Sequence, residues 1–159
     1  MKVRSALSAF ACFGLAAWFA VARADEVKVP LDKLPQAVTK AIKAKFPTGS
    51  LKQAEKEVED GKTIYEVGLE DGGTKIDVSL KEDGTILEIE KEIPAAALPK
   101  AVSAALKEKY SKGTIKKAEE IAKGETRSFE VIVAVGNKRR EVVLDPGGKI
   151  LEDEESDED

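Results

Sequence analysis

Carboxylates are the side chains of this sequence that could do chemistry most readily, because they are abundant and spread along the chain. The 159 residues include 30 aspartates and glutamates against 26 lysines and arginines. Paired carboxylates can serve as acid and base in hydrolysis. Glu66 and Glu130 occupy equivalent positions 64 residues apart, and so do Asp77 and Glu141. No run of apolar pocket residues surrounds them to raise a pKa. The sequence therefore predicts solvated strand residues at these positions rather than a hydrolase site.

A calcium loop is the second chemistry that the spacing suggests. The run from Ser79 to Glu90 has Asp83 before Gly84 and a glutamate at its end, as an EF-hand loop has. Ser79 and Lys81 occupy the first two ligand positions, however, where acidic or amide oxygens are required. The run is therefore interpreted as a hairpin turn.

The last eight residues are a further group of candidate cation ligands, because all of them except Ser156 are acidic. A run of like charges repels itself, which predicts a disordered acidic tail over residues 152–159. Weak binding of calcium or of a basic partner is its functional alternative, and no other cofactor or metal site is predicted. The candidate ligands are Glu152, Asp153, Glu154, Glu155, Asp157, Glu158 and Asp159.

Charge is also polarised along the rest of the chain. Residues 25–93 carry a net charge of −5 and residues 94–151 a net charge of +5, while the tail adds −7. The acidic tail folds back on the basic half in one interpretation, and the protein is then a monomer. In the other, opposite patches of two molecules associate weakly head to tail. The candidate partner-binding residues are Lys138, Arg139 and Arg140, which lie near a predicted turn, together with Glu66 and Glu130.

Residues 1–24 have the three parts of a secretory signal. Lys2 and Arg4 precede an apolar run over residues 6–21, and Ala22-Arg23-Ala24 is a small-x-small cleavage site. The apolar run is shorter than the ~20 residues that a spanning helix needs, which disfavours the alternative of a retained anchor. We expect cleavage after Ala24, a periplasmic or secreted protein, and no membrane span. That compartment, with the acidic tail, excludes a nucleic-acid partner.

Removal of this segment takes away several chemically distinctive residues. The one Cys, the one Trp and the one Met all lie within it, and the chain has no His. The mature protein then lacks the side chains for thiol or imidazole catalysis, for disulfides, and for histidine or thiolate metal sites. The sequence thus predicts that the protein is not an enzyme.

The elements that would position the remaining residues follow from an internal repeat. A shift of 64 positions superimposes Leu34-Pro35 on Leu98-Pro99 and Tyr65-Glu66-Val67 on Phe129-Glu130-Val131, and no gap is needed. We therefore predict two repeats, over residues 25–93 and 94–151, between the signal peptide and the acidic tail.

Each repeat begins with a helical pattern and continues with strands. Apolar residues recur at helical spacing over residues 34–46 and 98–110, and apolar and polar residues then alternate between Gly-containing turns. A less regular strand is expected over residues 50–58 and 114–122. Consecutive hairpins require antiparallel pairing. The predicted fold class is α+β, with two α-β-β-β-β repeats, the helices on one face of an antiparallel sheet, and eight strands if the sheet is continuous.

The strand patterns resemble a known family. Residues 65–88 and 129–152 resemble the closing hairpins of PepSY domains. Each stretch has an aromatic-x-Val strand, a turn and an alternating strand, followed by an Asp-Gly or Gly-Gly turn before Ile-Leu. The Leu-Pro-x-Ala-Val start at residues 34–38 and 98–102 resembles the PepSY-like family described as β-lactamase-inhibitor-like. The resemblance covers residues 31–152. It implies an exported protein that binds or inhibits other proteins, and it brings no catalytic residues.

A non-enzymatic binding module that acts on an unidentified extracytoplasmic protein, such as a hydrolase, is therefore the favoured function. Interfaces take their strongest anchors from Trp, Tyr and Arg. The mature chain has no Trp and only Tyr65 and Tyr110 as tyrosines, which argues against tight inhibition. The alternative is a cation-responsive or charge-buffering envelope protein that acts through the acidic tail.

Overall fold

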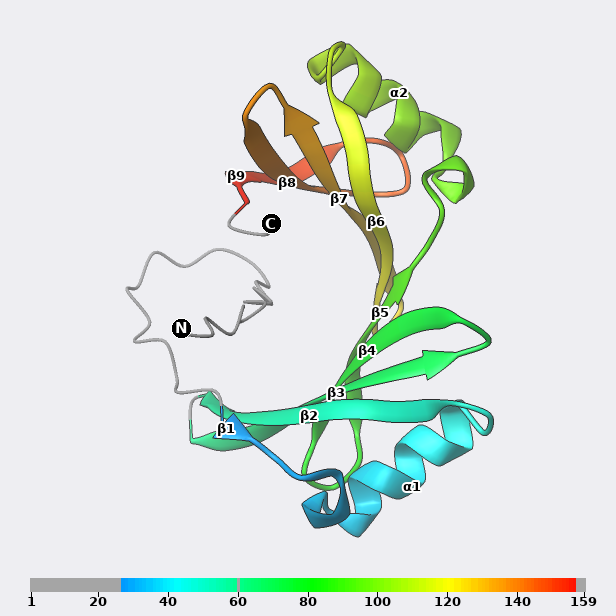
Figure 1. Cartoon of the computed structure of the whole chain (residues 1–159), viewed down its shortest axis with the longest axis vertical. Coiled ribbons are helices and arrows are strands. Elements are labelled where there is room, and N and C mark those ends of the chain that lie inside the picture. The colour runs from blue at the N-terminus through cyan, green and yellow to red at the C-terminus, as the bar shows by residue number, and fades with distance from the viewer. Residues whose placement is uncertain (1–26, 60, 157–159) are drawn as a thin grey trace, which may run out of the picture.

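The computed structural model describes residues 27–59 and 61–156, so the predicted signal peptide lies outside the described residues. In the described part, nine strands accompany two α-helices (Figure 1). The helices are α1 (Gln36–Lys45) and α2 (Lys100–Lys109), each preceded by a short 3-10 helix, Leu31–Lys33 or Ala95–Ala97. The strands are β1 (Val27–Lys28), β2 (Ser50–Glu59), β3 (Lys62–Asp71), β4 (Thr74–Lys81), β5 (Ile86–Glu92), β6 (Thr114–Lys123), β7 (Thr126–Val135), β8 (Lys138–Leu144) and β9 (Ile150–Glu155).

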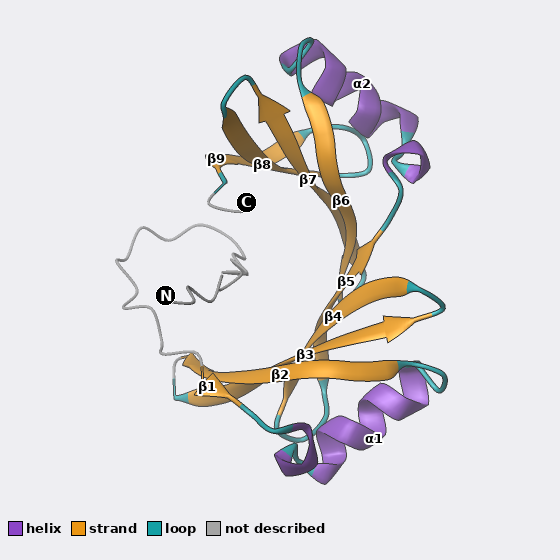
Figure 2. Cartoon of the chain, in the orientation of Figure 1, coloured by secondary structure: helices purple, strands orange, loops and turns teal. Residues whose placement is uncertain are grey.

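All nine strands form one antiparallel sheet in which each strand pairs with its neighbours in the sequence (Figure 2). Strands β5 and β6 join the two repeats, with Ile89 opposite Ala122 and Glu92 opposite Glu119. The predicted α+β fold with repeated α-β-β-β-β units is thus confirmed, and the sheet is continuous. Two residues of β1 pair with β2 and add a ninth strand that the sequence did not predict.

The helices form where the sequence places an apolar stripe between a proline and an aromatic residue. In α1, Val38 and Ile42 are buried, and the Phe46 amide donates to the Ile42 carbonyl at 2.7 Å where the helix ends. In α2, Val102 and Leu106 are buried in the same way. Pro35 and Pro99 stand just before the first helical turn in extended conformation, where a missing backbone N–H costs nothing.

Each helix packs on the strands of its own repeat, and both helices cover the same face of the sheet. The first core contains Val67, Val78 and Leu80 from β3 and β4, and the second contains Val131 and Val142 from β7 and β8. Residues directly opposite each other in an antiparallel pair point to the same face. Because Ile89 of the first core lies opposite Ala122, on the Ala118 side of β6, the two cores share one face.

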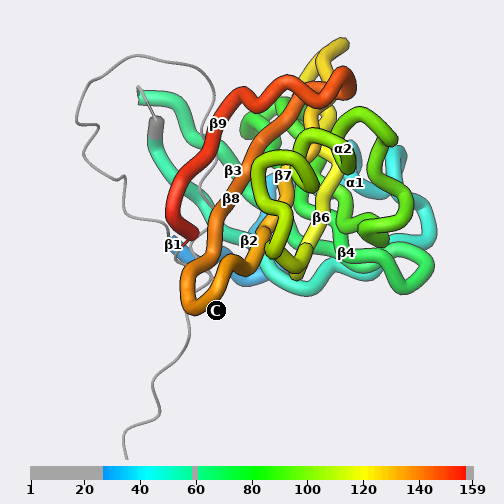
Figure 3. The backbone as a smooth tube through the Cα atoms, turned by 90° about the horizontal axis from the view of Figure 1, so that it is seen from above, coloured from blue at the N-terminus to red at the C-terminus, as the bar shows by residue number. Residues whose placement is uncertain are grey.

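The sheet curves so that the two helices lie on the outside of the bend (Figure 1). The helix-free face lies on the inside, with β5 near the middle. Seen from above, β9 runs beside β8 at the C-terminal edge (Figure 3). Among the described residues, no helix covers the inner face of the sheet.

Gly84 and Gly148 lie in equivalent turns, each just before the last strand of its repeat. Gly84 and Gly148 have φ values of +84° and +85°, and a Cβ at either position would come within 2.6 Å and 2.5 Å of the Ala37 and Ala101 carbonyl oxygens. Each turn thus packs directly on the first turn of a helix, and only glycine fits. The run from Ser79 to Glu90 contains the first of these turns, as the hairpin prediction requires.

The predicted disordered tail needs a correction. Residues Glu152–Glu155 belong to β9, which pairs with β8 through contacts such as Arg140 opposite Glu155 and Val142 opposite Asp153. Like charges repel along an extended chain, but in a strand they alternate between two faces, and here some of them meet cations. Residues 157–159 lie outside the described residues.

Candidate functional site

The helix-free face of the sheet gathers most of the carboxylates of the described strands. The strand register assigns each side chain to a face, since directly opposed residues point the same way. The basic residues that the register assigns to this face lie mainly at strand ends, namely Lys62, Lys75, Lys81, Lys117, Lys123 and Arg139, and the Lys52 ammonium lies 3.3 Å from the Glu70 carboxylate. We define the acidic face as Glu55, Glu57, Glu66, Glu70, Asp77, Glu88, Glu90, Glu92, Glu119, Glu130, Glu141, Glu152 and Glu154.

Many carboxylates of the acidic face stand directly opposite one another. Like charges at such positions destabilise a sheet. The first repeat contains two such pairs, and the second contains two more exactly 64 positions later: Glu55 with Glu66 and Asp77 with Glu90, then Glu119 with Glu130 and Glu141 with Glu154. Such a pair is unfavourable wherever both carboxylates are ionised, and its recurrence at equivalent positions of both repeats is better explained by function than by folding.

Glu90 lies at the centre of this face, where the repeats join. It is 8% exposed, with Asp77 opposite it on β4 and Ile121 opposite it on β6. Burial raises its pKa from an ordinary 4.5 to about 9, and the hydrogen bond with Glu88 and the charges of Glu130 and Glu119 act in the same direction. Glu90 therefore holds a proton at neutral pH.

Its neighbours are also removed from water. Glu119 is 3% exposed, and the Lys117 ammonium lies 3.1 Å from its carboxylate. Burial also raises the pKa of Asp77, against the opposing charges of Lys117 and Lys75. The Lys123 ammonium lies 3.3 Å from the Glu88 carboxylate. These lysines offset part of the negative charge at the centre of the acidic face.

The structure brings together only some of the residues that the sequence singled out. Glu66 and Glu130 lie on strands of the acidic face, as predicted, but they are half-buried rather than fully solvated, because neighbouring strands flank them on both sides. The predicted basic patch divides between the two faces, with Arg139 on the acidic face and Lys138 and Arg140 on the other. Because alternate strand residues point in opposite directions, three consecutive cations cannot form one surface here.

The other two cations pair with acidic residues of β9. The Lys138 ammonium donates to the Glu155 carboxylate at 3.0 Å, and the Arg140 Nε donates to Asp153 Oδ1 at 2.8 Å. Asp153 also accepts from the Tyr110 hydroxyl at 2.5 Å and forms an ion pair with Lys109. This part of the predicted tail thus folds back on the basic half, as one of the two interpretations had it.

The described candidate cation ligands of the tail, Glu152–Glu155, do not converge. Glu152 and Glu154 point to the acidic face, whereas Asp153 and Glu155 point to the helix side, where they pair with basic residues. Across residues 27–59 and 61–156, no group of three or more His, Cys, Asp or Glu is arranged to hold a metal ion. Asp157, Glu158 and Asp159 lie outside the described residues.

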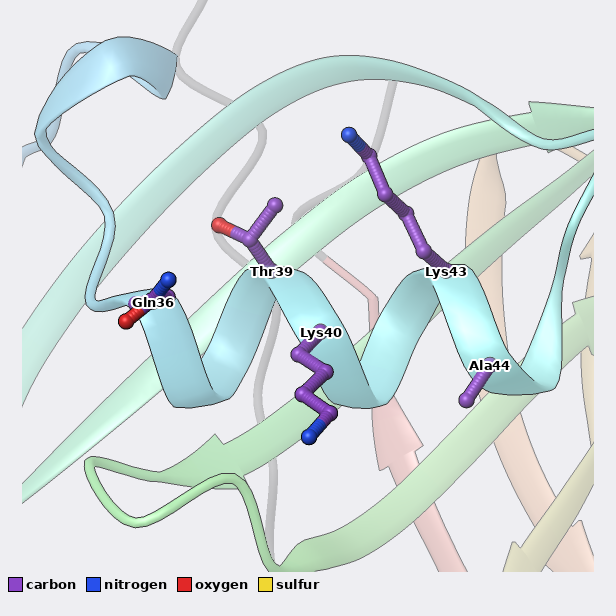
Figure 4. A pocket seen from close by; sticks show the side chains of 5 residues that line it. All are labelled: Gln36, Thr39, Lys40, Lys43 and Ala44. Atoms are coloured by element: carbon purple, nitrogen blue, oxygen red, sulfur yellow. The ribbon is translucent and has the colours of Figure 1, made fainter.

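A shallow hollow on the outer surface of α1 is another feature of the described residues that could hold a ligand (Figure 4). Its lining comes from one helix, namely Gln36, Thr39, Lys40, Lys43 and Ala44. The Thr39 hydroxyl donates to the Pro35 carbonyl at 3.3 Å, and the lysines diverge in Figure 4. These side chains do not converge on a common point, so the acidic face is the stronger candidate.

Sequence reasoning missed Glu90, Asp77 and Glu119 as parts of one site. Their proximity depends on the pairing of β4, β5 and β6, and the β5–β6 pairing joins strands that a helix separates in the chain. The hairpin around Gly84 could have placed Asp77 opposite Glu90. The burial of both residues could not have been found in this way, because it depends on the whole sheet.

The comparisons with known proteins identify the family. A family model described as "Putative beta-lactamase-inhibitor-like, PepSY-like" matches residues 14–88 and 63–152. The chain belongs to this PepSY-like family. The two matched segments of this PepSY-like protein overlap over residues 63–88, and their ends, at residues 88 and 152, are 64 positions apart, as in the internal repeat. No curated protein matches it.

Solved structures share the fold at low sequence identity. A protein described as BLIP-like from Bacteroides fragilis is 23% identical, with a TM-score of 0.61 over 76% of this chain and 84% of its own. A DUF2874 family protein from Bacteroides uniformis is 18% identical, with a TM-score of 0.66 over 76% of this chain and 88% of its own. A protein from Bacteroides eggerthii, described as periplasmic, has a TM-score of 0.65 at 18% identity, over 76% and 88% of the two chains.

The structure adds one observation on membranes. The helices α1 and α2 have 10 residues each. No helix in the described part of the chain is long and apolar enough to cross a bilayer.

Proposed function

We propose that this PepSY-like protein is an exported, non-enzymatic module that binds another protein outside the cytoplasm through the acidic face. The observation that carries the proposal is the set of opposed carboxylate pairs, present in both repeats on the inner side of the curved sheet. A binding partner that brings compensating groups would recover the stability that these pairs cost the free protein.

The family supports a binding role, since its description names inhibitor-like proteins. Export is supported by the N-terminal sequence and by the periplasmic description of the related Bacteroides eggerthii protein. A non-enzymatic role is in keeping with a chain that has no His and has its one Cys in the predicted signal. Cell fractionation, with mass spectrometry of the recovered N-terminus, tests export: we expect the protein outside the cytoplasm, beginning at Asp25.

The binding role is tested by affinity capture from a periplasmic extract of the source cell. The bait is the wild-type protein, and a matched bait carries Glu66→Gln, Glu88→Gln and Glu130→Gln. We expect a partner that the wild type enriches and the variant does not. Capture of no partner, or of the same partner by both baits, would contradict binding through the acidic face.

A further inference from the structure

The chemistry of the acidic face also indicates what kind of group it takes. Glu90 and Glu119 lie on the central strands of the acidic face and are only 8% and 3% exposed, so a single narrow side chain can approach them more closely than a flat partner surface can. The inference drawn here rests on the proposed function and deepens it, because it names the class of partner.

Apolar residues lie beside the carboxylates on the same face. Ile121 stands directly opposite Glu90 and Val143 directly opposite Glu130, and both apolar residues are half-buried. Lysine and arginine combine an apolar stem with a cationic head, so that the stem can pack on such residues while the head meets a carboxylate. A bare metal ion would use only the oxygens, and the described carboxylates do not converge for one.

Charge is divided between the two sides of the sheet in a way that excludes many partners. The exposed surfaces of α1 and α2 carry lysines, among them Lys40, Lys43, Lys100 and Lys107. The inner side carries the carboxylates of the acidic face, with fewer basic residues, which lie mainly at strand ends. An acidic partner would be repelled from the inner side, and a cationic partner would be steered to it rather than to the helices.

We propose that the acidic face binds a segment rich in lysine or arginine from an extracytoplasmic protein, and that its cationic side chains enter beside Glu90, Glu119 and Glu130. The segment lies along the middle of the bend, over β5, β6 and β7. Ion pairs with the opposed carboxylates that are ionised remove their mutual repulsion, and the apolar stems cover the half-buried Ile121 and Val143.

Binding is also linked to protons. In the free protein, the burial of Glu90 and its acidic neighbours favour the protonated form of this group; those neighbours are Asp77, Glu88, Glu119 and Glu130. A cation that binds near Glu90 favours the ionised form instead. Lys117, Lys123 and Lys75 are the cations that face this group from β6 and β4. The protein should therefore release protons when the segment binds, and calorimetry in buffers of different ionisation enthalpy measures that release.

The test uses the full chain expressed in a bacterial host and a fluorescent ten-residue peptide of alternating lysine and serine. Peptides in which glutamate or glycine replaces lysine are the controls. We expect saturable binding of the lysine peptide alone, weakened by salt. The acidic-face variant, with Glu66→Gln, Glu88→Gln and Glu130→Gln, should bind about tenfold more weakly.

A charge-matched variant makes the test specific. Glu82→Gln, Glu108→Gln and Glu125→Gln remove three exposed glutamates that lie outside the acidic face, so the net charge changes equally. This variant should bind within about twofold of the wild type. The melting temperatures of both variants should equal or exceed that of the wild type. Weaker peptide binding by the acidic-face variant is then not caused by unfolding.

Equal loss in both variants, or no preference for lysine, would overturn the inference. Self-association of the protein that the acidic-face variant abolishes would also overturn it, because the occupant would then be a second copy. The proposed function fails separately, if affinity capture finds no partner while the lysine peptide binds as expected. If a captured partner stays bound in high salt, the proposed binding function holds but the inference of a cationic segment fails, because salt weakens such ion pairs.

Discussion

The substitution Glu90→Gln tests the central carboxylate of the acidic face most sharply. Glutamine has the shape of the protonated glutamic acid and can still donate a hydrogen bond to Glu88, so the packing should be kept. The pKa of Glu90 is about 9 in the folded protein, against an ordinary 4.5. One pKa unit corresponds to about 1.4 kcal/mol. At pH 7 the unfolded chain ionises this group and the folded protein does not, which costs the wild type about 3 kcal/mol of stability.

The sign of the pH dependence follows from the raised pKa. Because the folded state holds the proton more tightly, the wild type loses stability as pH rises from about 4.5 to about 9. Glutamine does not titrate, so the variant should be more stable than the wild type by under about 1 kcal/mol at pH 5 and by about 3 kcal/mol at pH 7.

Urea unfolding at pH 5, 7 and 8.5, followed by circular dichroism, measures the two free energies of unfolding. Glu154→Gln is the matched control, because Glu154 is the exposed equivalent of Glu90 in the second repeat. Its effect should stay within about 0.5 kcal/mol at each pH. A Glu90→Gln effect that does not grow with pH, or that destabilises at pH 7, would refute the burial of this carboxyl group.

Two other features of the fold give predictions of their own. Asp153→Asn should destabilise the protein by about 2 kcal/mol at pH 7, because Arg140 and Lys109 lose their partly buried counter-charge. Hydrogen bonds from these groups and Tyr110 outweigh the burial of Asp153 and lower its pKa, so the difference should shrink as pH falls below about 4. Urea unfolding that shows no such loss would contradict the ion pair. Gly148→Ala should cost at least about 1 kcal/mol more than Gly124→Ala in thermal unfolding, because both have positive φ but only the former approaches a carbonyl oxygen. Equal costs would contradict the packing of that turn on α2.

The regular elements could be predicted from the sequence because their signals are local. The apolar spacing over residues 34–46 and the turns near Gly72 and Gly84 each depend on a short stretch of chain. The 64-residue repeat then extended each prediction to the second half. The expected strands over 50–58 and 114–122 correspond to β2 and β6 in the structure.

The errors concern charged residues whose surroundings are assembled by distant strands. In the first repeat, the positions equivalent to Tyr110, Arg140 and Asp153 are the apolar Phe46, Ile76 and Ile89. Where the first repeat has these three apolar residues, the second repeat has Asp153 hydrogen-bonded to Tyr110 and Arg140. These bonds help to hold residues 150–155 of the acidic run against β8 as strand β9. The burial of Glu90 likewise requires β4 and β6 on its two sides.

An NMR titration of the isotope-labelled protein with the lysine peptide tests the central claim most directly, since it locates the binding surface. We expect the largest chemical-shift changes in residues 88–92, 117–121 and 128–132, which form the middle of the acidic face in β5, β6 and β7. Changes confined to α1 and α2, or to the loops at the strand ends, would contradict the acidic face as the surface that binds a partner.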